Sequence, residues 1–119
     1  SQHAIYKGSK FDLFEVVVDG KHLLQEFIDG LSGTDQKKVQ ALFKYTADNG
    51  TPRNDQKFKK VEDDLFEFKS YQIRIFCAFR GKSVLILTHG IIKKRDKLNK
   101  QEIQKAKDIL ALLDKRKGK

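Results

Sequence analysis

Cysteine and long apolar segments are scarce in this chain of 119 residues. The single cysteine, Cys77, excludes an internal disulfide and fits a reducing, cytoplasmic environment. No uncharged apolar run approaches the roughly 20 residues that cross a bilayer, and no signal-peptide pattern opens the chain. We therefore expect one soluble domain over residues 1–119, a length that folds without disulfides or metal ions.

Several motifs that carry enzyme chemistry are also missing. His3, His22 and His89 lie far apart in the sequence without companion cysteines, so the sequence does not predict a zinc site. There is no glycine-rich phosphate loop after a strand and no serine in a nucleophile-elbow context. The acidic run at residues 62–64 is more typical of a solvated turn than of a metal site. We expect chemistry without metal ion or cofactor, or no chemistry.

Positive charge is abundant instead. The chain has 25 Lys and Arg residues against 16 Asp and Glu residues, which gives a formal net charge of +9. A small domain with this charge attracts polyanions, and binding through phosphate contacts weakens as salt rises. Nucleic acid is therefore a favoured partner, although an acidic protein partner or solubility alone would account for the same charge.

The longest strand-like sequence lies between residues 65 and 94, and we expect the fold to be organised around it. Residues 71–79 alternate between two sides, and the side that carries Cys77 is entirely apolar. Residues 84–92 form a second, β-branched run. The segment Arg80-Gly81-Lys82-Ser83 between them suits a two-residue type II′ hairpin turn, with its first and last residues opposite each other.

This turn fixes a register in which Arg74 faces His89 on one side of the ribbon. Lys93 and Lys94 follow where the last strand ends, so cationic residues gather at one end of the sheet. A second interpretation is purely structural. In it, Arg74 pairs with a carboxylate such as Glu67, and His89 is a half-buried histidine whose hydrogen bonds are satisfied.

The remaining segments complete a small α+β fold. In chain order we expect a polar lead-in at 1–10, an interior strand at 11–19, helices at 21–31 and 34–49, a polar loop at 51–63, a third ribbon strand at 65–69 that turns back through Lys69-Ser70, and a helix at 99–116. The expected architecture is a small, antiparallel-rich sheet of about four strands. An N-terminal helical hairpin covers it, and a basic C-terminal helix follows it.

The chain resembles the HigB-type branch of the RelE/ParE toxins of bacterial toxin–antitoxin pairs in four strings: LFEFK, YQIRIF, GKSVLILTHGIIKK and QEIQKA. The HG-xx-KK pattern at a strand end is the most specific part of the similarity. The chain departs from the family pattern at three places. Ile91 or Ile92 replaces an aromatic residue, Cys77 takes a position where tyrosine is common, and residues 95–99 lack a Thr-Pro pair.

The resemblance implies a RelE-like fold and a cytoplasmic toxin that cleaves mRNA, usually on the ribosome. It also implies a helix-turn-helix antitoxin of the HigA type, in an assembly as large as a heterotetramer. The residues that match the family motif are Lys69, Arg74, His89, Lys93 and Lys94. We therefore take Arg74, His89, Lys93 and Lys94 as candidate catalytic residues, and Lys69, Arg80, Lys82, Arg95 and Lys97 as candidate RNA-binding residues.

Such a nuclease attacks phosphorus with the adjacent ribose 2′-hydroxyl, and needs a base, an acid and cations for the developing charge. The planar guanidinium of Arg74 suits the phosphate, and Lys93 and Lys94 suit charge stabilisation or proton donation. His89 is the natural base, with a lysine of lowered pKa as the alternative. Two other functions stay open: a ParE-like gyrase poison that binds without catalysis, and a non-toxic basic nucleic-acid-binding protein.

Overall fold

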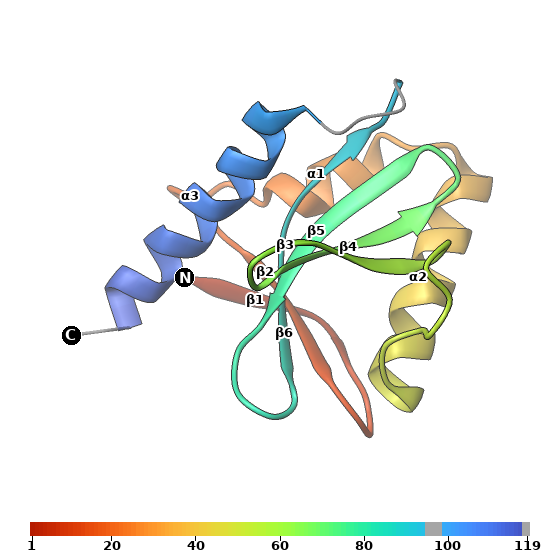
Figure 1. Cartoon of the computed structure of the whole chain (residues 1–119), viewed down its shortest axis with the longest axis horizontal. Helices are drawn as coiled ribbons and strands as arrows, with labels where there is room; N and C mark the ends of the chain where they lie inside the picture. Colours follow the sequence, from red (N-terminus) through yellow and green to blue (C-terminus); the bar gives the residue numbers. More distant parts are fainter. Residues whose placement is uncertain (95–98, 118–119) are drawn as a thin grey trace.

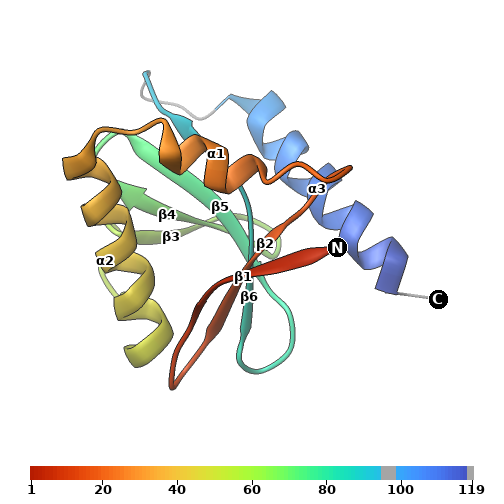
Figure 2. The same cartoon turned by 180° about the vertical axis from the view of Figure 1, so that it is seen from behind.

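A six-stranded sheet with helices on both faces forms the structure, a computed structural model that describes residues 1–94 and 99–117 (Figures 1 and 2). The strands are β1 (Gln2–Lys7), β2 (Asp12–Val16), β3 (Phe58–Glu62), β4 (Leu65–Ser70), β5 (Ile73–Phe79) and β6 (Val84–Ile92). The helices are α1 (Leu23–Asp29), α2 (Gly33–Asn49) and α3 (Lys100–Lys117). The α+β class and the chain order of the main elements agree with the sequence prediction.

The sheet is larger than predicted, and it is mixed because one of its strand pairs is parallel. Its strand order is β1-β2-β6-β5-β4-β3, and β2 pairs with β6 in parallel while every other pair is antiparallel. The two extra strands are β1, in the predicted lead-in, and β3, in the predicted polar loop. Both are edge strands with at most one buried side chain each, so neither shows the hydrophobic alternation of a half-buried strand.

The predicted helical hairpin covers one face of the sheet (Figure 2). Its buried residues are Leu24 and Ile28 of α1 and Val39, Leu42, Phe43 and Ala47 of α2, in one cluster with the inward residues of the strands. The helix α2 is capped by Ser32, whose hydroxyl accepts a hydrogen bond from the Asp35 backbone N–H at 3.1 Å. The helix therefore begins at Gly33, one residue before the predicted start at residue 34.

The opposite face is covered in part by α3, which contacts β6 and β2 (Figure 1). Ala106, Ile109, Leu110 and Leu113 of this helix pack in a second apolar cluster. The part of this face that β3 and β4 form has no helix over it (Figure 1). No helix within residues 1–94 and 99–117 combines the length and the apolar character that a membrane span requires.

The register of the central ribbon differs from the prediction in two places. The β4–β5 turn is Tyr71-Gln72 instead of Lys69-Ser70, since Ser70 pairs with Ile73. The β5–β6 loop has three residues, because the Arg80 N–H donates to the Val84 carbonyl. A bulge further along the pair then puts Arg74 opposite Ile91, two residues beyond His89.

Candidate functional site

The ion pair of Glu67 and Arg74 is the centre of the candidate site. The two residues lie on adjacent strands, and only 6% and 7% of their surfaces are exposed. Arg74 Nε lies 3.5 Å from Glu67 Oε1, and the Arg74 Nη1 group donates to the backbone carbonyls of Tyr71 and Ile73. Arg74 therefore has the carboxylate partner of the structural interpretation, and it does not project from an exposed rim.

This ion pair is incompletely satisfied. Glu67 Oε1 and Arg74 Nε are both buried, and neither has a hydrogen-bond partner among the described residues. Burial raises the pKa of the Glu67 carboxyl above its ordinary value, and the nearby positive charges of Arg74, Lys69, Lys93 and Lys59 offset this only in part. A buried carboxyl whose pKa is raised beside several cations is a common property of active sites.

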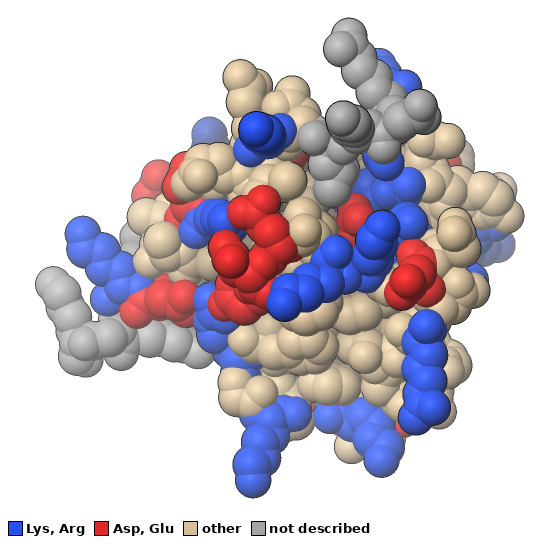
Figure 3. All heavy atoms as spheres, viewed as in Figure 1, with Lys and Arg blue, Asp and Glu red and all other residues tan. Residues whose placement is uncertain are grey.

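Positive side chains gather around this pair. Lys69 lies on β4 beside Arg74, its partner in the strand pairing. Lys93 directly follows β6, and its backbone N–H donates to the Gln72 carbonyl, which fixes the end of β6 beside the β4–β5 turn. Figure 3, seen from the α3 side, shows a band of Lys and Arg side chains across the middle of this face, with acidic side chains on either side of it.

A cleft of about 910 Å³ opens next to the pair, between α2, residues 52–57 and the β4–β5 turn. Its charged lining residues are all basic: Lys38, Arg53, Lys57, Lys69 and Arg74. Two tyrosines line it as well, Tyr45 with 52% and Tyr71 with 76% of the surface exposed. A cleft with this lining and volume suits an anionic ligand with flat rings.

Tyr71 has an unusual backbone conformation at the edge of this cleft. Its φ is +56°, in the left-handed region that a bulky residue seldom adopts. The Lys38 ammonium lies 4.2 Å from the centre of its ring, a cation–π contact that ties the turn to α2. Backbone strain of this kind concentrates at binding and catalytic sites, where the surrounding structure holds it in place.

His89 belongs to a different environment. It is 3% exposed, its ring stacks on Phe76 with 5.1 Å between centroids, and its Nε2 lies 3.0 Å from a Glu102 carboxylate oxygen. Burial lowers the pKa of His89 below its ordinary value, an effect that the bond to Glu102 only partly opposes. No hydrogen bond or ion pair links His89 to Arg74 in the described parts of the chain, so His89 here connects β6 to α3.

The other predicted site residues are divided between the two ends of the ribbon. Lys69 and Lys93 lie near the Glu67–Arg74 pair, and Lys94 is exposed beyond them. Arg80 and Lys82 lie at the opposite end of β5, roughly 20 Å away by strand geometry. There Arg80 forms ion pairs with Asp64 and Asp114. Arg95 and Lys97 lie outside the described residues.

Sequence reasoning missed most of the cleft. Lys38, Tyr45, Arg53 and Lys57 come from a helix and a loop that carry no motif, and only the fold places them beside β4. The sequence named Glu67 only as a possible partner of Arg74, although the alternation of LFEFK also puts it on the same side of β4 as Lys69. Cys77 was predicted correctly as a core residue, since it is fully buried and burial raises the pKa of its thiol well above the ordinary value.

Comparison with known proteins shows the family to which the chain belongs. No curated protein matches the chain significantly. The profile of the family described as phage-derived protein Gp49-like (DUF891) matches residues 26–111, which include the cleft and the Glu67–Arg74 pair. This family is associated with toxins of toxin–antitoxin pairs, of the RelE/HigB kind. Since the match covers most of its length, the chain belongs to the phage-derived Gp49-like family.

Proposed function

We propose that this protein is the toxin of a toxin–antitoxin pair and an endoribonuclease that cleaves mRNA, with the translating ribosome as its place of action. The observation that carries the proposal is the basic cleft, because two exposed tyrosines line it together with Arg74, whose ion-pair partner is Glu67. Basic side chains follow an RNA backbone, and aromatic rings stack on unpaired bases. The association of the Gp49-like family with toxins supports the same function.

Arg74 is proposed to bind the scissile phosphate. Its Nε is a buried donor without a hydrogen-bond partner among the described residues, and an unmade bond of this kind is costly. A phosphate oxygen would satisfy it, and the planar guanidinium matches that group. Because Arg74 is buried, the phosphate must displace the loose contact with Glu67 to reach it.

Glu67 is proposed as the base that takes the proton of the ribose 2′-hydroxyl. Its Oε1 is a buried acceptor without a hydrogen-bond partner in the described chain, and its raised pKa makes it a better proton acceptor than an ordinary carboxylate. His89 is the second candidate, and it would first have to leave Glu102. The attacking oxygen belongs to the RNA itself, so the proposed reaction uses no metal ion or cofactor.

Lysines complete the proposed reaction. As the 2′-oxygen bonds to phosphorus, negative charge develops on the phosphate oxygens, and the bond to the 5′-oxygen breaks. Lys69 and Lys93 contribute positive charge at the Glu67–Arg74 pair, and Lys94 follows in the chain. We assign these lysines to stabilising that charge and to donating the proton that the leaving 5′-oxygen needs.

An acidic antitoxin of the helix-turn-helix type is the proposed partner. The net charge of +9 attracts such a protein by electrostatic steering, and covering the basic cleft would block RNA. A gene for a small helix-turn-helix protein beside this one would support the pairing. Co-purification of the two proteins, with RNA cleavage restored when the antitoxin is removed, would test it directly.

Induced expression in bacterial cells tests the proposal. The nuclease predicts growth arrest with a fall in amino-acid incorporation and shortened mRNAs. The gyrase poison predicts a DNA-damage response with mRNA length unchanged, and a non-toxic binding protein predicts normal growth. Either of these last two outcomes would overturn the nuclease proposal.

Variants then locate the site. Lys69→Ala should slow cleavage of a synthetic RNA on the order of 10²-fold, because it removes one cation beside the phosphate. Glu67→Gln should slow it by about 10²–10⁴-fold, as expected for loss of a general base. Lys44→Ala is the matched control, an exposed α2 lysine outside the cleft, and should leave the rate unchanged. Cleavage at the normal rate by the first two variants would contradict the site assignment.

A further inference from the structure

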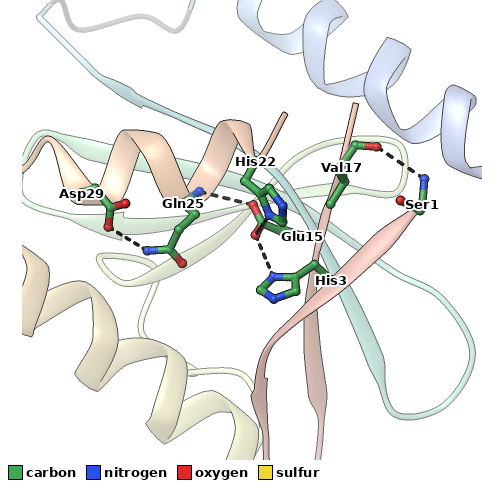
Figure 4. Close-up of polar contacts among 7 residues, drawn as sticks. All are labelled: Ser1, His3, Glu15, Val17, His22, Gln25 and Asp29. Carbon is green, nitrogen blue, oxygen red and sulfur yellow. Dashed lines mark hydrogen bonds and ion pairs between the residues drawn. The ribbon is translucent and has the colours of Figure 1, made fainter. Parts of the chain in front are cut away.

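Three ligand-type side chains meet at the β1–β2 edge of the sheet, away from the cleft beside β4 and β5 (Figure 4). His3 of β1 is the cross-strand partner of Glu15 of β2, and His22 directly precedes α1. One oxygen of Glu15, Oε2, lies 3.0 Å from His3 Nδ1 and 2.9 Å from His22 Nδ1. The sequence did not predict a zinc site because these histidines are far apart in the chain, and the β1–β2 pairing removes that separation.

We propose that His3, Glu15 and His22 bind one divalent transition-metal ion, with Zn²⁺ as the preferred ion. Tetrahedral coordination with bonds of about 2.0 Å holds neighbouring donor atoms about 3.3 Å apart. The two measured nitrogen–oxygen separations are within a few tenths of an ångström of that value, and no two of the three donor atoms lie more than 4.8 Å apart. Two imidazoles and one carboxylate are a donor set that Zn²⁺ uses in proteins.

The surroundings of Glu15 also suit a metal site. Glu15 is fully buried, and its other oxygen, Oε1, accepts the Gln25 backbone N–H at 3.3 Å. This bond turns Oε2 toward the imidazoles, as second-shell bonds do for metal-ligating carboxylates. The side chains of His3 and His22 are 54% and 42% exposed, so an ion can enter and water can take a fourth position.

The two rings are arranged so that their Nδ1 atoms converge. They meet edge to face, with 5.0 Å between centroids and an angle of 86° between their planes. The competing interpretation is a hydrogen-bond cluster in which both Nδ1 atoms carry a proton and donate to Glu15. In the metal site both Nδ1 atoms are instead unprotonated ligands and each Nε2 carries the proton, so the tautomer distinguishes the two.

The proposed ion has a structural role apart from the nuclease site. It would join β1, β2 and the start of α1, three elements at one edge of the sheet. The strand β6 separates β2 from β5, which carries Arg74. Metal binding should therefore raise the melting temperature of the protein, and it does not depend on the proposed RNA cleavage.

Cobalt substitution tests the proposal. The full-length protein, without an affinity tag and treated with EDTA, is titrated with Co²⁺ and followed by its visible absorption. We expect one ion per chain with the intense bands of four-coordinate cobalt, displaced by Zn²⁺ and not by Mg²⁺. His3→Gln and His22→Gln should each weaken binding by at least about 100-fold. Gln25→Ala is the matched control, because its side chain donates to Asp29 and its backbone N–H is retained.

A second measurement separates the metal site from the hydrogen-bond cluster. Nitrogen-15 NMR of the imidazoles should show the proton of both rings on Nε2 in the zinc-loaded protein. Protons that stay on both Nδ1 atoms at saturating Zn²⁺ would overturn the proposal, as would Co²⁺ bands that persist in both histidine variants. Circular dichroism of each variant verifies its fold, which an exposed edge-strand position such as His3 should tolerate.

Discussion

Gly90 of the HG-xx-KK pattern should be required by packing and not by chemistry. A Cβ atom at this position would lie 2.4 Å from Phe27 Cδ2 and 2.5 Å from Phe27 Cε2. Carbon atoms in contact are about 3.5–4.0 Å apart, so the ring would have to withdraw by about 1 Å or more. Phe27 lies on α1, which packs against β6 at this point. Gly90→Ala should therefore push α1 away from the sheet.

The expected cost of Gly90→Ala is about 1–3 kcal/mol of unfolding free energy, the range for overpacking. This loss corresponds to a fall in melting temperature of about 4–12 °C for a domain of this size. The backbone of Gly90 is not in the left-handed region, so the cost comes from the clash alone. Urea titration and thermal denaturation of the purified variant measure it.

A double-mutant cycle gives the decisive result. Phe27→Ala removes the clashing ring atoms, so Gly90→Ala should cost close to nothing in that background, and the coupling energy should equal the whole clash. Gly33→Ala is the matched control, because nothing lies within 4 Å of its Cβ position, and it should be neutral or stabilising. The reasoning is refuted if Gly90→Ala is as stable as the parent, or if its cost is undiminished in the Phe27→Ala background.

Two further predictions concern Tyr71 and His89. Tyr71→Gly should stabilise the protein by about 1 kcal/mol, since glycine tolerates a φ of +56°, and should slow RNA cleavage about tenfold or more through lost stacking. Urea titration and a cleavage assay measure both effects, and unchanged cleavage would argue against a stacking role. Burial lowers the pKa of His89, so the unfolded chain takes up the proton first as pH falls. The contribution of neutral, buried His89 to the free energy of unfolding is therefore fully present above about pH 6.5 and is lost progressively as the pH falls below it. Between pH 7.5 and pH 5.5 the urea midpoint of His89→Gln should fall less than that of the parent protein. An equal fall in the two proteins would contradict the burial argument.

The sequence predicted the buried elements best. The segment IRIFCAF of β5 is almost continuously apolar because both of its sides are buried, and α2 shows the spacing of one buried stripe. The edge strands β1 and β3 bury too few side chains to leave such a pattern. The ribbon register was wrong because Tyr71 adopts a turn conformation that its residue type does not indicate, and because a bulge interrupts β5–β6 pairing.

The partners of the candidate site residues were predicted only in part: Glu67 was named as a possible partner of Arg74, and Glu102 was not named as a partner of His89. The motif named Arg74 and His89 as candidate site residues, but the carboxylate that each one contacts comes from another element of the fold. Glu67 and Glu102 supply those carboxylates here, and only the fold brings Glu102 of α3 to His89. The basic cleft and the histidine cluster have the same origin, since each is assembled from segments without a shared sequence motif.

The position of β6 has a consequence for synthesis of the chain. This strand joins β2 on one side to β5 on the other, so residues 2–79 leave two separate sheet fragments until residues 84–92 are available. The parallel pairing of β2 with β6 also closes a long loop, which makes folding slow and late. During translation the two sheet fragments therefore stay unjoined until residues 84–92 have left the ribosomal tunnel.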